Sequence, residues 1–325
     1  MRNVLLVPIC LVALFASAQV GASGRQNLAI AGGHLSLAAN RDATFASPSR
    51  LPAPEFVLRK DVREVRVEFS VTDRQGRHVT SISRNDFQLT DNGTPVAELT
   101  GFQQASDLPL DLAILIDSSA STEHELPTEK QLALEFLQKL LRPQDRALIA
   151  GFSTHLIVPG SFTKHFDQLE DSVRSLHAGG LTALNDSIFE LAADDFIGAS
   201  TARKVLIVIT DGYDSVSRRN FKDAMNSVLR SDVTVYTISI RDKKSLEPAA
   251  CLAELSALTG GHSYVMKDLR KVKDAFSQID ADLRTYYVAT YRAPDRDRAS
   301  FHALNVKLDT AGLSVQNRKG YFREE

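Results

Sequence analysis

The sequence has 325 residues, of which 43% are hydrophobic and 24% are charged, and its formal net charge is −2. This is the composition of a globular protein with enough length for one medium-sized core and a smaller one. The near-neutral balance gives no indication of a nucleic-acid partner or of an anionic membrane surface, so we predict neither. Composition alone indicates no particular function, whereas the motifs do.

The first eighteen residues have the pattern of a secretory signal peptide. Arg2 provides a positive charge, the apolar run extends from Val4 to Ala16, and Ala16-Ser17-Ala18 offers the small residues that a signal peptidase reads. The run is shorter than the roughly 20 residues that span a bilayer, and an uncleaved N-terminal anchor is the alternative. We therefore predict a signal peptide at 1–18, an exported protein in the periplasm or outside the cell, and no transmembrane segment in the mature chain.

Cysteine usage adds one expectation. Cys10 would leave with the signal peptide, so Cys251 has no intrachain partner and the mature fold does not depend on a disulfide. Cys251 lies in an apolar helical pattern with Leu252, Leu255 and Leu258, which predicts a buried, inert thiol.

The flanks of the chain differ from its centre. Residues 19–58 are rich in Gly, Ser, Ala, Asn and Pro without periodicity, which indicates a linker. Residues 65–72 alternate apolar and polar side chains, and Asp91-Asn92-Gly93 is a strong hairpin signal. We predict an N-terminal β segment at 59–105 and a C-terminal β segment at 284–325. The two segments are expected to pair into one small β-sandwich.

Between residues 110 and 283 the sequence alternates strand and helix patterns. The runs 112–116 and 205–210 are fully apolar, as expected for parallel strands that helices cover on both faces. The remaining patterns predict strands at 146–152, 156–158, 233–240 and 262–266, and helices at 127–141, 165–176, 184–196, 217–230, 247–258 and 268–284. The predicted fold class is therefore α/β, a doubly wound, mostly parallel, Rossmann-like sheet, with the small β-sandwich formed by the flanks.

Oxygen-bearing side chains follow the predicted strands where each strand ends. Asp117, Ser119 and Ser121 come directly after the strand 112–116, Thr182 follows Gly179-Gly180, and Asp211 follows the strand 205–210. Ligands collect at the carboxyl ends of strands in such sheets, and these are hard oxygen ligands suited to Mg²⁺. Taken alone, the first loop also fits serines that cap the next helix.

In this order and strand context the five residues resemble the metal-ion-dependent adhesion site of von Willebrand factor type A domains, across residues 110–283. Asp86-Phe87-Gln88-Leu89 and Arg318-Lys319-Gly320-Tyr321-Phe322 are similar to the Acidobacteria-type branch of that family. The resemblance implies a six-stranded, mostly parallel sheet with one short antiparallel edge strand. It also implies that Ser119, Ser121 and Thr182 bind Mg²⁺ (or Mn²⁺ or Ca²⁺) directly, and that Asp117 and Asp211 act directly or through water.

The predicted function is an exported, metal-dependent adhesion or protein-binding module. Neutral hydroxyls leave the cation incompletely neutralised, with a position that an Asp or Glu side chain of a protein partner can fill. Tyr213 and His124 lie next to the predicted ligands and are candidates for contacting that partner, and Asp186 near Thr182 is either an indirect contributor or a helix-start carboxylate. Two alternatives stay open, a Mg²⁺-dependent hydrolase and a scaffold whose metal is purely structural.

No catalytic residue is predicted, and we expect that the protein is not an enzyme. Ser161-Phe162-Thr163-Lys164 matches Ser-x-x-Lys, but the accompanying Lys-Thr-Gly is absent. His-Glu-x-x-His, Gly-x-Ser-x-Gly and Walker motifs are absent as well. A hydrolase would also need a general base other than Asp117 and Asp211, which the metal already occupies.

Overall fold

A computed structural model describes most of the chain after its first 63 residues. All described residues belong to one compact unit, Lys60–Glu325. The predicted signal peptide at 1–18 and linker at 19–58 lie outside the described residues. The structure describes residues 64–105, 108–195, 202–240, 247–266, 268, 271–293 and 301–322.

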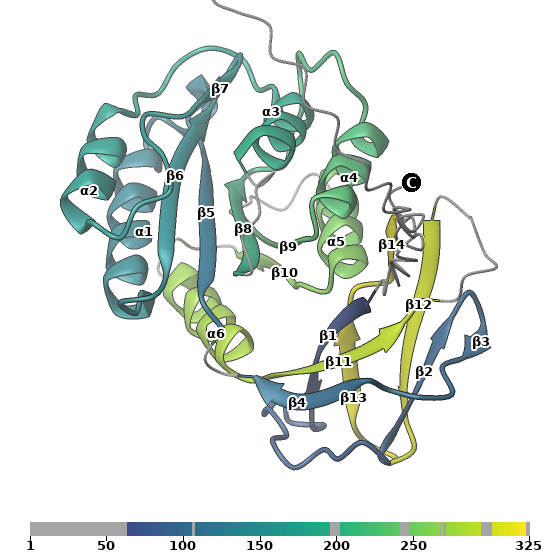
Figure 1. The fold of residues 1–325 in the computed structure, drawn as a ribbon. Coiled ribbons are helices and arrows are strands. Elements are labelled where there is room, and N and C mark those ends of the chain that lie inside the picture. Colours follow the sequence, from purple (N-terminus) through teal and green to yellow (C-terminus); the bar gives the residue numbers. More distant parts are fainter. Residues whose placement is uncertain are drawn as a thin grey trace, which may run out of the picture. The chain divides into compact units, whose positions relative to one another are not determined.

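The centre of the chain forms a doubly wound α/β unit around a six-stranded sheet (Figure 1). The sheet order is β10-β9-β8-β5-β6-β7, and only the short edge strand β7 runs antiparallel. The predicted fold class is confirmed. The strands are β5 (Leu110–Asp117), β6 (Arg146–Phe152), β7 (Leu156–Ile157), β8 (Arg203–Thr210), β9 (Val233–Ile240) and β10 (Ser263–Met266).

Helices cover both faces of this sheet, which explains why β5 and β8 are apolar along nearly their whole length. The helices are η1 (Ala120–Thr122), α1 (Leu126–Leu140), α2 (Phe166–Ser175), α3 (Leu184–Glu190), which continues into the π-helical turn η2 (Leu191–Asp195), α4 (Phe221–Arg230), α5 (Glu247–Thr259) and α6 (Val272–Arg284).

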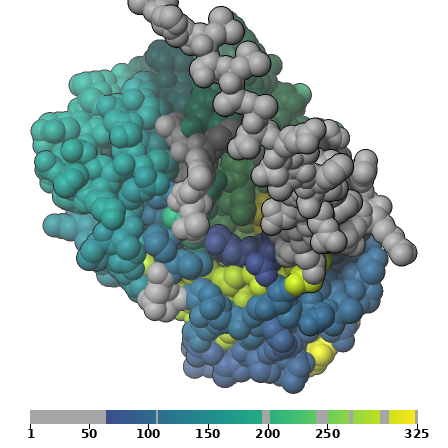
Figure 2. All heavy atoms as spheres, in the orientation of Figure 1, coloured from purple at the N-terminus to yellow at the C-terminus, as the bar shows by residue number. Residues whose placement is uncertain are grey.

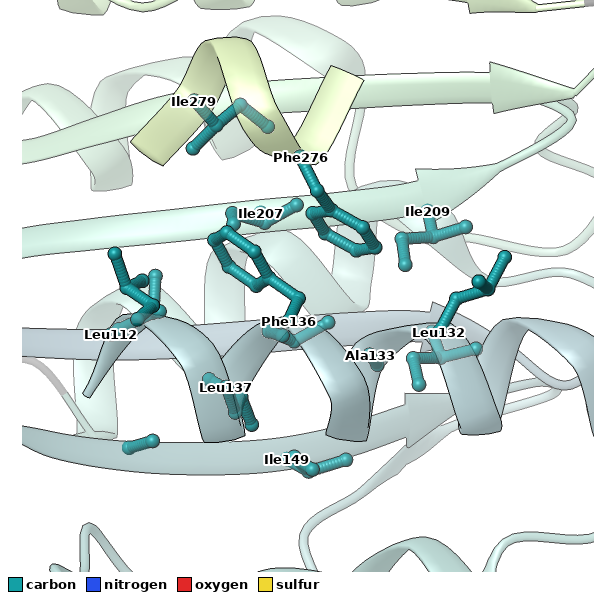
Figure 3. Close-up of a cluster of buried hydrophobic side chains, with 14 of the residues drawn as sticks. Leu112, Leu132, Ala133, Phe136, Leu137, Ile149, Ile207, Ile209, Phe276 and Ile279 are labelled. Atoms are coloured by element: carbon teal, nitrogen blue, oxygen red, sulfur yellow. The ribbon is translucent and has the colours of Figure 1, made fainter. Parts of the chain in front are cut away.

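Alternate residues of β5 point to different layers of helices. Leu112 and Ile114 pack with α1, α2 and α6, whereas Ala113 and Leu115 pack with α3, α4 and α5. Figure 3 shows the first of these cores, where Phe136 of α1 stacks on Phe276 of α6 with ring centroids 4.3 Å apart. Two hydrophobic layers, one on each face, therefore pack the helices against the sheet. The loops lie at the carboxyl ends of the parallel strands.

The flanks of the chain form two four-stranded antiparallel sheets, β13-β1-β11-β4 and β14-β12-β2-β3. One hydrophobic cluster draws residues from both sheets, among them Phe69 and Phe87, whose ring centroids lie 5.0 Å apart, so the sheets pack as a sandwich. The strands are β1 (Glu64–Thr72), β2 (Phe87–Asp91), β3 (Thr94–Pro95), β4 (Gly101–Ala105), β11 (Tyr286–Arg292), β12 (Phe301–Leu308), β13 (Ser314–Asn317) and β14 (Gly320–Phe322).

Strands from the two ends of the described chain interleave in this sandwich. β1 lies between β13 and β11, and β2 pairs with β12. In Figure 2 the early strands (blue) and the late strands (yellow) occupy the same part of the surface. The expected pairing of the N-terminal and C-terminal β segments is thus what the structure shows.

The sandwich contacts the α/β unit through buried charged side chains. The Arg203 guanidinium lies 2.8 Å from a Glu68 carboxylate oxygen and 4.0 Å above the Tyr286 ring. The Asp282 carboxylate, on α6, accepts hydrogen bonds from His78 of the sandwich side and from His262. Because Arg203 is the first residue of β8, these contacts lie at the amino ends of the parallel strands.

The structure corrects the sequence expectations in two details. Cys251 is exposed, because the buried face of α5 runs through Leu252, Leu255 and Thr259 instead, so the expectation of a buried thiol is wrong. Helix α4 begins at Phe221 rather than 217, because Asn220 caps it in a capping box with Asp223. No helix among the described residues combines the length and hydrophobicity needed to span a membrane.

Candidate metal centre

The first loop of the candidate site begins where β5 ends, at Asp117. This carboxylate is fully buried, and both of its oxygens have donors. The Ser119 N–H donates to Oδ1 over 3.0 Å, and the Thr210 hydroxyl donates to Oδ2 over 2.7 Å. The Thr122 hydroxyl donates to the Asp117 carbonyl over 2.9 Å. The ends of β5 and β8 therefore hold this side chain in one orientation.

Four of the five predicted ligands form one continuous chain of contacts. Asp117 accepts from the Ser119 amide, the Ser119 and Ser121 hydroxyl oxygens lie 3.0 Å apart, and the Ser121 hydroxyl is 3.4 Å from the Asp211 carboxylate. Asp211 is 90 residues from Ser121 in the sequence. Hence the carboxyl ends of β5 and β8 meet, as the topology requires.

Thr182, the fifth predicted ligand, reaches the same edge through its main chain. The Ala120 N–H donates to the Gly180 carbonyl over 3.1 Å, which joins the first loop to the loop before Thr182. The Thr182 N–H donates to the Ser215 hydroxyl over 2.9 Å, and its carbonyl accepts the Ser215 N–H over 2.8 Å. In the described residues, Thr182 is therefore positioned by hydrogen bonds of its main chain. No hydrogen bond joins its side chain to the other four predicted ligands in that part of the chain.

Three loops that are distant in sequence thus close a ring. The first loop contacts the second between Ala120 and Gly180, and the second contacts the third between Thr182 and Ser215. The third returns to the first between Asp211 and Ser121. Such mutual bonding fixes the relative positions of the three loops.

Gly180 is required by this ring. Its φ of +81° lies in the left-handed region, and a Cβ added there would meet the Thr154 hydroxyl oxygen at 2.6 Å. Only glycine adopts this conformation without steric cost and leaves room for the neighbouring loop. The Gly-Gly pair in the sequence therefore has a structural reason beside the site.

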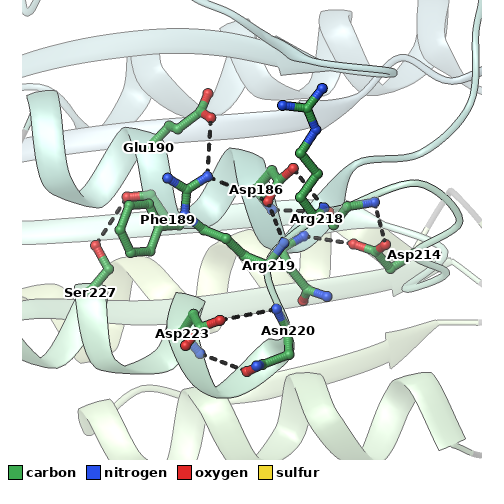
Figure 4. Close-up of polar contacts among 11 residues, drawn as sticks. Asp186, Phe189, Glu190, Asp214, Arg218, Arg219, Asn220, Asp223 and Ser227 are labelled. Atoms are coloured by element: carbon green, nitrogen blue, oxygen red, sulfur yellow. Dashed lines mark hydrogen bonds and ion pairs between the residues drawn. The ribbon is translucent and has the colours of Figure 1, made fainter.

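The third loop, after Asp211, is anchored by Asp186 (Figure 4). The Asp186 carboxylate accepts the main-chain N–H groups of Arg218 and Arg219, each over 2.9 Å. Burial raises the pKa of Asp186, but these hydrogen bonds outweigh it and lower the pKa below its ordinary value. The Arg219 guanidinium also stacks over the Phe189 ring at 4.0 Å. Asp186, which the sequence left as an indirect contributor or a helix-start carboxylate, therefore anchors the third loop.

Carboxyl groups gather around the ring. Burial raises the pKa of Asp117, and repulsion from Asp211 adds to that effect, although hydrogen bonds from Ser119 and Thr210 oppose it. Glu129, on α1, is 3% exposed, and one of its carboxylate oxygens has no hydrogen-bond partner. Burial and repulsion from Asp117 raise the pKa of Glu129 to about 8. A cation at the ring would relieve the repulsion between these carboxyls.

The donor set suits a hard dication. Two carboxylates and three hydroxyls are oxygen ligands of the kind that Mg²⁺, Mn²⁺ and Ca²⁺ prefer. No group of three or more His, Cys, Asp or Glu side chains among the described residues has metal-binding geometry.

Sequence reasoning missed several residues of this region. In the Thr-Asp-Gly motif only Asp211 was predicted as a ligand. The structure shows that the Thr210 hydroxyl donates a hydrogen bond to Asp117. Thr122, Ser215 and Glu129 are likewise absent from the predicted set. A Ser or Thr within a ligand loop, and a Glu on the buried face of α1 beside Leu126, Leu132 and Ala133, are the only signals that could have indicated them.

The two candidate partner-contact residues are both exposed. Tyr213 is 47% exposed, and its N–H donates to the Asp211 carboxylate over 3.0 Å. His124 lies just beyond η1 and is also exposed. Tyr213 therefore stands directly beside a predicted ligand, and His124 lies three residues after Ser121.

Comparison with known proteins identifies the family. The model of the von Willebrand factor type A domain matches residues 111–278, and no curated protein matches the chain. A von Willebrand factor type A structure from Catenulispora acidiphila is 12% identical, with coverage of 81% of this chain and 75% of that chain and a TM-score of 0.50. An aerotolerance-related membrane protein from Bacteroides fragilis is 17% identical, with 53% and 98% coverage and a TM-score of 0.44. The first likeness shows the fold alone. Since the matched domain spans just over half of the sequence, the chain belongs to the von Willebrand factor type A domain family.

Proposed function

We propose that this protein is an exported binding module that captures an acidic side chain of a protein partner through a divalent cation, and that it is not an enzyme. Domains of its family are generally modules for protein interaction and adhesion. The signal-peptide pattern of residues 1–18 supports export. The observation that carries the proposal is the closed ring of three loops, with Ser121 and Asp211 in contact across 90 residues of sequence.

Each ring residue has a distinct part in this proposal. Asp117, Ser119, Ser121, Thr182 and Asp211 would hold the cation, which is Mg²⁺ or the similar ions Mn²⁺ and Ca²⁺. When bound, the cation supplies a Lewis-acid position that an incoming carboxylate can occupy. The three hydroxyls add no negative charge, so a partner's carboxylate is attracted rather than repelled. Thr210 and Thr122 keep the first loop in place.

The bonding of the carboxylates argues against hydrolysis. A hydrolase needs a free general base within reach of a water molecule. Both oxygens of Asp117 already accept hydrogen bonds from Ser119 and Thr210, and one oxygen of Asp211 accepts the Tyr213 N–H. These groups are arranged to hold their loops and a cation, which favours binding over turnover.

The test combines metal binding with capture of a carboxylate probe. Wild-type protein and Asp211→Asn are titrated with Mg²⁺ by calorimetry, and both are exposed to an immobilised pool of Asp-containing peptides and to its Asn counterpart. We expect the wild type to bind Mg²⁺ and to retain Asp peptides only while Mg²⁺ is present. Asp211→Asn should lose both properties and keep its fold. Asp171→Asn, an exposed carboxylate on α2, is the matched control and should behave as the wild type.

The outcomes separate the alternatives. Capture that persists in excess EDTA contradicts the proposal. A rise in melting temperature with Mg²⁺, without capture of any peptide, indicates a scaffold with structural metal. Mg²⁺-dependent cleavage of the retained peptides indicates a hydrolase.

A further inference from the structure

Exposed apolar side chains are concentrated around the ring of loops. Three large hydrophobic residues stand out as exposed in the described part of the chain: Leu181 at 57%, Tyr213 at 47% and Val265 at 55%. Single exposed hydrophobics are ordinary on protein surfaces, but a group of them beside a binding site indicates an interaction surface. Leu181 and Tyr213 both adjoin predicted metal ligands.

Hydrogen bonds hold both residues in their exposed positions. The Leu181 N–H donates to the Thr154 hydroxyl over 3.1 Å, and the Tyr213 N–H donates to the Asp211 carboxylate over 3.0 Å. Leu181 stands between Gly180, which is bound to the first loop, and Thr182, which is bound to the third. The exposure of these side chains is thus a property of well-bonded loops.

The same bonds place Leu181 and Tyr213 on adjoining loops. Thr182, which follows Leu181, is bound to Ser215, two residues after Tyr213. Ser121 and Asp211, whose side chains lie 3.4 Å apart, belong to the same ring. A peptide whose carboxylate reached a cation in this ring would meet the loops that carry these two exposed side chains.

We propose that Leu181 and Tyr213 form an apolar rim that binds hydrophobic side chains next to the partner's acidic residue. The preferred partner is a protein segment in which Asp or Glu is flanked by residues such as Leu, Ile or Phe. This inference rests on the proposed function, because the rim has a role only if the cation captures a carboxylate. Burial of Leu181 and Tyr213 by such a segment would add affinity by the hydrophobic effect and select among acidic peptides.

The experiment uses the full chain and two matched sets of synthetic peptides. Each peptide has a central Asp, flanked in one set by Leu, Ile and Phe and in the other by Ser, and a central Asn replaces the Asp in control peptides. Fluorescence anisotropy in excess Mg²⁺ gives the dissociation constants for wild type and for Leu181→Ser/Tyr213→Ser. Val265→Ser removes a similarly exposed apolar side chain from β10, three strands from β5 in the sheet. Calorimetry with Mg²⁺ alone checks the cation site of each variant.

We expect the apolar-flanked Asp peptides to bind wild type about tenfold more tightly than the Ser-flanked peptides. The double variant should lose this preference and keep the Mg²⁺ affinity of the wild type, and Val265→Ser should keep both. Equal binding of the two peptide sets, or a preference that survives in the double variant, overturns the rim while leaving cation-dependent capture standing. Failure of every Asp peptide to bind in Mg²⁺ counts against the proposed function itself, and the rim falls with it.

Discussion

The buried Glu129 side chain has a pKa that depends on the neighbouring carboxylates of the candidate site. It is 3% exposed on α1, its Oε2 has no hydrogen-bond partner, and repulsion from Asp117 and Asp211 acts on it. A carboxyl in such surroundings stays protonated until its pKa, raised to about 8 by burial, is passed. In the absence of metal, the folded protein therefore keeps a proton that the unfolded chain has already released.

This difference makes metal-free stability depend on pH. An unfolded Glu releases its proton near its ordinary pKa of 4.5, whereas folded Glu129 releases it at about 8. Between these values the folded state binds more protons, so the free energy of unfolding falls as pH rises, by up to about 1.4 kcal/mol per pH unit. We expect Glu129→Gln, which cannot ionise, to flatten this decline in urea unfolding in EDTA.

Glu135→Gln, on the same helix, is the matched control for that series. The Glu135 side chain is 43% exposed and paired with Lys273 at 2.8 Å, so its removal should leave the pH slope as in the wild type. Parallel slopes for wild type and Glu129→Gln across about pH 5 to 8 would contradict the assignment of a buried neutral carboxyl.

At the scale of elements, Gly180 tests whether the loops are held as a ring. Gly180→Ala places an L-residue at a φ of +81° and a Cβ against Thr154. We expect a loss of stability of about 1–2 kcal/mol from backbone strain and an affinity for Mg²⁺ about tenfold lower, because the second loop must shift. Gly93→Ala is the control, since Gly93 has a φ of +77° but open space around it. Gly93→Ala should lose stability in thermal unfolding and keep its Mg²⁺ affinity. A similar loss of Mg²⁺ affinity in both variants would contradict this explanation.

Local patterns predicted most elements of the α/β unit. The apolar runs around Leu112 and Val205 became central strands, and the period-2 alternation at 65–72 became β1, because burial on one or both faces leaves a direct trace in the sequence. The strands β4 and β14 were not separately predicted. Their burial depends on neighbours that are distant in the chain, such as β11 for β4.

The candidate site, like the fold, could be predicted only in part from the sequence. The five candidate ligands follow strand ends or a Gly-Gly pair in a recognisable order, so they could be proposed from the sequence: Asp117, Ser119, Ser121, Thr182 and Asp211. The supporting contacts could not, because the bond from Thr210 to Asp117 spans 93 residues and the bond from Thr182 to Ser215 spans 33. Only the folded sheet brings these side chains together.

At the scale of the whole described unit, the sandwich and the candidate site lie at opposite ends of the parallel strands. Arg203, at the amino end of β8, contacts Glu68 and Tyr286 of the sandwich, whereas Asp211 follows the carboxyl end of the same strand. The buried junction therefore supports the sheet without covering the ring of loops. Among the described residues, the sandwich therefore lies away from the candidate site.

The junction should also make the described unit unfold cooperatively. Arg203 is 5% exposed, and Arg203→Leu leaves the Glu68 carboxylate without this buried partner, which costs about 3–5 kcal/mol. We expect circular dichroism and tyrosine fluorescence to report one shared, shifted transition in urea. Arg174→Leu, which breaks exposed pairs on α2, should cost at most about 1 kcal/mol. Separate transitions for the two probes would show that the sandwich and the α/β unit are independent.

We propose that three loops hold one hard cation between their oxygen-bearing side chains. Anomalous scattering from a crystal of the full chain grown with Mn²⁺ tests it most directly. We predict one strong anomalous peak within about 2.1 Å of the hydroxyl oxygens of Ser119 and Ser121, next to Thr182 and Asp211. Well-ordered loops with no peak among these side chains would contradict the account.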